Sequence, residues 1–256
     1  MINQNKKINK YSFRELRSSC QKNAPNPARE SLIGLSSRIF SIYFTKLFLL
    51  LKIGPHMITT ISVFIFFVGI FIFLFNNYWF NIVGTLIIYL SIILDCCDGE
   101  VARFKKQTGV LGGMYTEPVS HDIQYGIAFL LLGIILFFNG YSVIYIILGA
   151  IASISKLLYR FLEIRYWYLV HIDKTQEEIN EIKKQYNQKH FLIRLFYWLN
   201  KNFFSSTAIF TMLFIFSFIN RPHWSLWWFA IGYFGLWVLL FLKQVYQINK
   251  QNLYEK

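Results

Sequence analysis

The chain has 256 residues, of which 55% are hydrophobic, and it carries a formal net charge of +13. Its apolar residues come in long blocks, whereas a soluble domain of this length alternates apolar and charged residues, so the composition indicates a membrane protein. Lys and Arg collect on the cytoplasmic side of such proteins, and no basic helix with interleaved aromatics stands outside the blocks, so no nucleic-acid partner is expected.

The first polar segment covers residues 1–30 and is expected in the cytoplasm. Residues 31–53 follow as an apolar stretch with one polar stripe at helical spacing, formed by Arg38, Ser41, Thr45 and Lys46. This pattern predicts an amphipathic helix in the membrane interface. An additional membrane span is the alternative, although Gly54 and Pro55 break the chain immediately after it. The apolar block also begins too late for a cleavable signal peptide.

Six apolar blocks are long enough to be membrane spans. They cover residues 57–75, 79–94, 119–138, 141–162, 203–219 and 224–242. The expected fold is therefore an all-α integral membrane protein, with six transmembrane helices preceded by an amphipathic interfacial helix. The six-helix domain is expected over residues 54–243, with a charged cytoplasmic connector at 166–202 and a cytoplasmic tail at 244–256.

The charges predict how the spans are oriented. The short connections after the first, third and fifth blocks hold Arg221 as their single basic residue, whereas nearly all other Lys and Arg lie in the remaining segments. The positive-inside rule then places both termini in the cytoplasm. We expect a multi-pass protein of a prokaryotic inner or plasma membrane.

The segment between the second and third blocks holds the residues that carry chemistry. Asp95 and Asp98 lie at positions i and i+3, so a helix places both carboxylates on one face. Two like charges so close repel unless a cation neutralises them, and carboxylate oxygens suit Mg²⁺, Mn²⁺ or Ca²⁺. Gly99 lets a ligand approach the backbone, and Arg103 offers a planar donor group suited to phosphate oxygens.

Glu117 and His121 begin the next block at positions i and i+4, and they again share one helical face. If they face the aspartate pair, the four groups form a cage between two helices. Two metal ions about 3.5–4 Å apart are a common device for phosphoryl displacement, because they stabilise both the attacking and the leaving oxygen.

These residues resemble the pattern of the CDP-alcohol phosphotransferases (the CDP-alcohol phosphatidyltransferase family), which is DxxDGxxAR, then eight or nine residues, then GxxxDxxxD. The matching residues in this chain are Asp95, Asp98, Gly99, Ala102 and Arg103, followed after nine residues by Gly113, Glu117 and His121. The first half matches at every fixed position. Glu117 and His121 depart from the third and fourth Asp of the pattern. The entry to the first span, with Pro55, His56 and Thr59, also resembles the family's Pro-Asn-x-x-Thr.

The resemblance implies metal-dependent transfer of a phosphoalcohol group, phosphatidyl or similar, from a CDP-linked donor to an alcohol with release of CMP. The pathway would be phospholipid or lipid-linked glycan biosynthesis, in a homodimer whose site faces the cytoplasm. The implied ligands of two Mg²⁺ or Mn²⁺ ions are Asp95, Asp98, Glu117 and His121. Asp98, Glu117 and His121 are the implied catalytic residues, with His121 in the place of the general base. The implied CDP and phosphate contacts are Gly99, Ala102, Arg103 and Gly113.

Three basic residues end the fourth block: Lys156, Arg160 and Arg165. Their long side chains suit lipid headgroups at the interface. Alternatively, Lys156 and Arg160 form a pocket for a phosphate on the acceptor, which is a lipid or a small alcohol. Asp122 is a spare acidic candidate beside His121. Two other functions stay open from the residues alone, namely a cation-dependent transporter and an inactive family member that serves as a binding protein.

Overall fold

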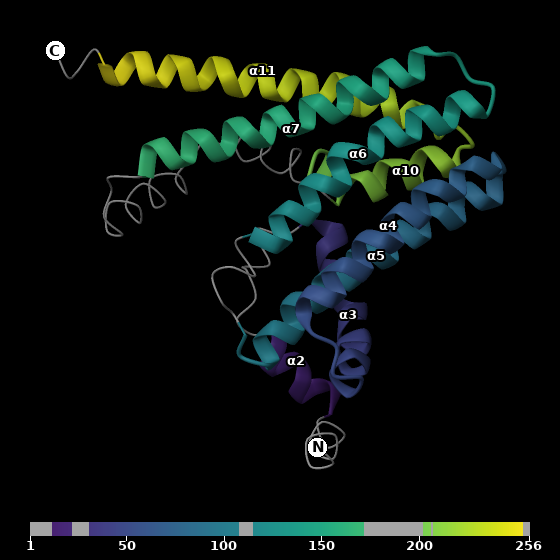
Figure 1. Cartoon of the computed structure of the whole chain (residues 1–256), viewed down its shortest axis with the longest axis vertical. Helices are drawn as coiled ribbons and strands as arrows, with labels where there is room; N and C mark the ends of the chain where they lie inside the picture. The colour runs from purple at the N-terminus through teal and green to yellow at the C-terminus, as the bar shows by residue number, and fades with distance from the viewer. Residues whose placement is uncertain (1–11, 22–30, 108–114, 172–201, 206, 253–256) are drawn as a thin grey trace.

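The computed structural model describes residues 12–21, 31–107, 115–171, 202–205 and 207–252. Every regular element in these ranges is a helix (Figure 1). In chain order they are α2 (Phe13–Gln21), α3 (Leu32–Leu50), α4 (Pro55–Phe71), the 3₁₀ turn η2 (Ile72–Phe75), α5 (Tyr78–Phe104), α6 (Glu117–Phe138), α7 (Ile144–His171), α10 (Ala208–Phe218) and α11 (Trp224–Asn252).

Six of the described helical segments are long and apolar enough to cross a membrane, which confirms the predicted fold class. They are Leu32–Leu50, Pro55–Phe75, Tyr78–Phe104, Glu117–Phe138, Ile144–Tyr166 and Trp224–Asn249. The number of such helices agrees with the sequence prediction, but one helix in the set is different. Helix α3 is among the six, and the predicted span over 203–219 is not, because its continuous helix covers only Ala208–Phe218.

A turn shortens α10. The backbone N–H of Ala208 donates to Ser205 O at 3.0 Å, and the Ser205 and Thr207 hydroxyls lie 3.0 Å apart. A helix of 11 residues is about 16 Å long at a rise of 1.5 Å per residue, roughly half the apolar thickness of a bilayer.

Local sequence explains where the long helices begin. Ser31 Oγ accepts a hydrogen bond from Gly34 N at 3.1 Å and caps α3, and Asn77 Oδ1 accepts one from Trp79 N at 2.9 Å and caps α5. Helix α4 begins at Pro55 directly after Gly54, so the predicted break lies where the sequence placed it.

Glycines let neighbouring helices approach closely. A Cβ atom on Gly69 of α4 would lie 2.8 Å from Gly84 O of α5, and a Cβ atom on Gly133 of α6 would collide with the backbone of α7 at Tyr145. Small residues at such crossings are typical of membrane helices, where close backbone packing replaces the hydrophobic effect. The α4–α5 and α6–α7 pairs are therefore the closely packed units of the bundle (Figure 1).

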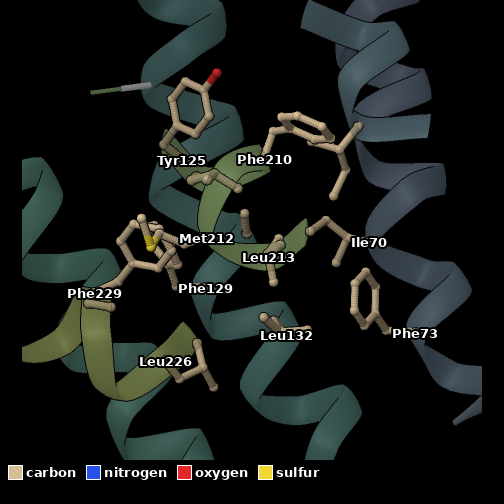
Figure 2. Close-up of a cluster of buried hydrophobic side chains, with 14 of the residues drawn as sticks. Ile70, Phe73, Tyr125, Phe129, Leu132, Phe210, Met212, Leu213, Leu226 and Phe229 are labelled. Carbon is tan, nitrogen blue, oxygen red and sulfur yellow. The ribbon is translucent and has the colours of Figure 1, made fainter. Parts of the chain in front are cut away.

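The main apolar core lies between α4, α5, α6, α7, α10 and α11. Figure 2 shows part of it, with Phe129 and Phe229 packed beside Met212 of α10. The Phe129 and Phe229 rings are 4.7 Å apart. This core fixes α6 against the rest of the bundle and so fixes the position of His121 near its start.

A second apolar cluster covers the carboxyl-terminal half of α5. Leu16 and Cys20 from α2 and Ile42 from α3 are fully buried there against Cys97 and Val101 of α5. The two N-terminal helices therefore pack on the part of α5 that contains the sequence motif. Figure 1 shows them at the end of α5 that lies away from α11.

Candidate active site

The motif residues lie on the last turns of α5. The predicted span ended at residue 94, but the helix continues without a break to Phe104. Asp98 is 5% exposed, and the Thr59 hydroxyl of α4 donates to its Oδ2 at 2.5 Å. Thr59 is the residue that the sequence marked only as part of the resemblance at the start of the first span. In the structure it holds one carboxylate oxygen of Asp98.

Asp95 and His121 join α5 to α6. His121 Nε2 lies 3.0 Å from Asp95 Oδ2, and both side chains are about a quarter exposed, at 26% and 22%. An ionised carboxylate only accepts hydrogen bonds, so Nε2 carries the proton that is shared with Asp95. The other oxygen of Asp95, Oδ1, is buried without a hydrogen-bond partner among the described residues.

Glu117 is the first residue of α6 and its side chain is exposed. It interacts electrostatically with Asp95, His121 and Arg103, and Asp98 interacts in the same way with Asp95 and Glu117. The structure thus brings the four predicted ligands into one electrostatic neighbourhood between α5 and α6. Within the described ranges, however, no three His, Cys, Asp or Glu side chains lie close enough together to hold one metal ion as they stand.

The donor chemistry nevertheless fits a divalent cation. Asp95 Oδ1 is a buried acceptor that receives no hydrogen bond from the part of the chain that the structure describes, and such an atom is costly unless a cation or a proton meets it. The acidic groups around it add negative charge. Carboxylate oxygens are the ligands that Mg²⁺ and Mn²⁺ prefer.

Arg103 lies over Gly99. A Cβ atom on Gly99 would lie 3.2 Å from Arg103 Nη1 and 3.6 Å from Nη2, so the missing side chain makes room for the guanidinium. Arg103 Nε donates to Cys20 O of α2, and no described residue accepts a hydrogen bond from its Nη atoms. Ala102 is half-buried on the same helix. Gly113, the remaining predicted phosphate contact, lies outside the described residues.

Glu100 is a buried acid that the sequence reasoning missed. It is 1% exposed and accepts hydrogen bonds from Ser41 Oγ at 2.6 Å, Thr45 Oγ1 at 2.6 Å and Gln21 Nε2 at 2.7 Å. The polar stripe of residues 31–53 was expected to face the interface, but its hydroxyl members face α5. The sequence did contain a sign of this contact, because Ser37, Ser41 and Thr45 follow one another at a spacing of four residues and so share one helix face.

A cavity of about 260 Å³ opens beside His121. Its lining comes from α6, α7 and the turn before α10, and it consists of Pro118, His121, Asp122, Tyr125, Lys156, Tyr159, Arg160, Glu163, Phe204 and Ser205. The predicted basic pair, Lys156 and Arg160, therefore shares one cavity with His121. Arg165 is exposed and is not part of this lining.

The charges in the cavity are partly paired. Arg160 lies 3.7 Å from Asp122 Oδ1 and 3.1 Å from Glu163 Oε2. Lys156 Nζ lies 4.8 Å above the centre of the Tyr233 ring. Asp122, the spare candidate of the sequence analysis, is thus an ion-pair partner of Arg160 and lines the same cavity.

Similarity to known proteins shows the family of the chain. No curated protein matches the chain. The family model described as CDP-alcohol phosphatidyltransferase matches residues 52–231, a range that includes α4 to α7, α10 and every motif residue. This range covers well over half of the 256 residues, and the chain therefore belongs to the CDP-alcohol phosphatidyltransferase family.

Proposed function

We propose that the protein transfers a phosphoalcohol group from a CDP-linked donor to an acceptor alcohol and releases CMP, in the synthesis of a phospholipid or another lipid-linked product. Family membership supports the reaction class. The observation that carries the proposal is the arrangement of Asp95 and Asp98 on α5 opposite His121 on α6, with the Arg103 guanidinium over Gly99. This arrangement combines acidic groups with a phosphate-binding donor at the end of one helix pair.

Of the four predicted ligands, Asp95, Asp98 and Glu117 would hold two Mg²⁺ or Mn²⁺ ions, while His121 is left to serve as the base. When bound, these ions supply positive charge for the donor's pyrophosphate and the departing CMP. The buried, unpartnered Asp95 Oδ1 supports this assignment. The Thr59 hydroxyl donates to Asp98 Oδ2 and so fixes the orientation of this carboxylate, whose remaining lone pairs would bind the metal.

His121 is proposed as the general base. Because Asp95 accepts from Nε2, the imidazole presents Nδ1 as its acceptor nitrogen. A carboxylate that fixes the tautomer in this way also stabilises the imidazolium that forms when the base takes a proton. In this proposal Nδ1 takes the proton of the acceptor hydroxyl, and Asp95 serves as the orienting group.

The acceptor would enter the cavity beside His121. Lys156 and Arg160 line this cavity together with His121, so they suit an anionic group such as phosphate on the acceptor alcohol. On the donor side, Gly99, Ala102, Arg103 and Gly113 would contact the CDP group. The two reactants then meet between α5 and α6.

The setting of the reaction is also a proposal. The distribution of basic residues supports a site that faces the cytoplasm of a prokaryotic plasma membrane. A lipid reactant would reach the site from the bilayer and a water-soluble reactant from the cytoplasm. We further propose a homodimer, as the family resemblance implies.

A donor screen tests this function. The full-length protein, in membranes or in detergent with lipid, is incubated with CDP-diacylglycerol or with CDP-headgroup donors, each with Mg²⁺, with Mn²⁺ or with a chelator. We expect metal-dependent CMP release from one donor class, and mass spectrometry of the lipid product then names the acceptor. If neither class yields CMP, the enzyme assignment fails, and the transporter or the inactive binding protein becomes the better account.

Asp98→Asn is the matched variant for this screen. The amide keeps the shape of Asp98 and still accepts from Thr59, but it removes a charge from the metal site. We expect no detectable CMP release above background. Full activity in Asp98→Asn contradicts the role given to Asp98.

A further inference from the structure

The carboxyl end of α2 contacts two residues of the motif at once. Cys20 O accepts from Arg103 Nε, and the next residue, Gln21, donates from Nε2 to Glu100 Oε1 at 2.7 Å. Arg103 and Glu100 lie one turn apart on α5. The matched family range begins at residue 52, so α2 lies outside it.

Gln21 ties three helices together. Its Nε2 atom donates to Arg38 O of α3 at 2.9 Å as well as to Glu100 of α5. Both hydrogens of the amide group are thereby used. Glu100 in turn is held from α3 by Ser41 and Thr45, so the position of Gln21 is fixed from both sides.

The rest of α2 is anchored independently of Gln21. Leu16 and Cys20 are fully buried, and Arg17 Nη2 donates to Ile39 O at 3.2 Å. The rings of Phe13 and Tyr43 lie 5.0 Å apart. Loss of the Gln21 side chain would therefore leave α2 attached through Leu16, Arg17 and Cys20, and it would loosen only the last carbonyl groups of the helix, which include Cys20 O.

The position of the α2 carboxyl end affects the orientation of the Arg103 side chain. A hydrogen bond from Nε to Cys20 O fixes the guanidinium plane against Gly99, and it leaves the two Nη atoms for a ligand. An arginine that is already held in its binding position loses less conformational entropy when phosphate binds. Without the Cys20 carbonyl, the side chain is free to leave Gly99.

We propose that Gln21 is a positioning residue for the donor: it holds the end of α2 so that Cys20 O orients the Arg103 guanidinium toward the phosphates of the CDP group. This proposal rests on the proposed function, because it takes Arg103 as a donor contact. It adds a part of the chain outside the matched family range to the donor site.

Kinetics of Gln21→Ala test the proposal. We expect the KM for the CDP donor to rise about tenfold, the size of effect that one lost hydrogen bond near a charged group produces. The kcat and the acceptor KM should stay within about twofold, since the cavity beside His121 does not contact α2. Ser18→Ala is the control, because Ser18 is exposed on the same helix and bonds only locally to Glu15 O. A loss of kcat with unchanged donor KM contradicts the proposal.

A double-mutant cycle separates positioning from general stability. In Arg103→Lys the Nε donor is gone, so adding Gln21→Ala to that variant should raise the donor KM by less than twofold. If the two effects multiply in full, Gln21 does not act through Arg103. A loss of folded protein in Gln21→Ala that also lowers kcat would show a structural role and overturn the proposal.

Nucleotide binding provides a readout without turnover. CDP should raise the melting temperature of the wild-type protein and of Ser18→Ala more than that of Gln21→Ala. If the wild type releases CMP but Gln21→Ala behaves like it, this inference fails while the function stands. If the wild type releases no CMP, the proposed function fails, and the change in melting temperature on adding CDP then tests the role of Gln21. An equal rise in the wild type and in Gln21→Ala, or no rise in the wild type, overturns that role.

Discussion

His121 is the residue that most distinguishes this site from the family pattern, which has an acid there. The sequence identified it together with Asp95, Asp98 and Glu117, because fixed spacings on helices place side chains on known faces. The sequence did not show that His121 reaches Asp95 at 3.0 Å, since that contact depends on how α6 crosses α5. Glu100 was missed for the same reason, because its partners come from helices that are distant in the chain.

Two substitutions at His121 test its role as the base. His121→Ala removes the proton acceptor and should lower kcat by about 10²–10⁴-fold. His121→Asp restores the family's residue type and should keep kcat within about tenfold of wild type, because a carboxylate can also accept the proton. Steady-state CMP release measures both. Equal activity in His121→Ala and wild type contradicts the assignment.

Glu100 should matter for folding. Glu100→Ala removes the acceptor of the Thr45 hydroxyl and of one N–H of Gln21, whereas the Ser41 hydroxyl can still donate to Arg38 O. Unsatisfied buried donors cost about 1–3 kcal/mol each before relaxation, so the variant should be destabilised by roughly 2–5 kcal/mol. Glu100→Gln keeps an acceptor oxygen, so its free energy of unfolding should fall clearly less. Thermal unfolding in detergent compares the two, and equal losses count against this account of Glu100.

The helices themselves were largely predictable, since long apolar blocks between polar breaks define them. Gly54 and Pro55 marked the start of α4 correctly. The exceptions have physical causes. Helix α10 begins only after the turn in which Ala208 N donates to Ser205 O. The stripe on α3 was predicted to face the membrane interface, because hydropathy does not distinguish a polar face at the interface from one that meets a buried acid.

Helix crossings through glycine give a prediction about stability. Gly69→Ala places a Cβ atom 2.8 Å from Gly84 O and should cost about 1–3 kcal/mol through overpacking. Gly235→Ala is the control, because a Cβ atom there meets nothing within 4 Å and alanine favours a helix by about 0.5–1 kcal/mol. Thermal unfolding should rank Gly235→Ala at or above wild type and Gly69→Ala below it. The reverse order would contradict the packing seen at α4–α5.

The whole molecule is a bundle in which the motif end of α5 lies among α2, α3 and α4, while α7 and α11 run together away from it (Figure 1). In the sequence, basic residues precede α4 and follow α5, whereas the α4–α5 connection near Asn77 and the α6–α7 connection near Asn139 carry none. This asymmetry supports a site on the cytoplasmic side.

Thiol labelling tests that orientation. In intact cells a membrane-impermeant maleimide should label Asn77→Cys and Asn139→Cys but should not label Lys106→Cys, which lies just beyond α5. Permeabilised cells are the control and should label Lys106→Cys as well. Labelling of Lys106→Cys in intact cells would place the motif on the outer side.

The central claim is that the acidic side chains of α5, with Glu117 of α6, bind divalent cations. Electron paramagnetic resonance of Mn²⁺ bound to the purified protein measures this directly, with and without CDP. We expect the wild type to bind Mn²⁺ with up to two ions per chain, and Asp95→Asn, which removes the charge beside the unpartnered oxygen, to bind at least tenfold more weakly. Equal Mn²⁺ binding by the wild type and Asp95→Asn, or none by either, would contradict the account.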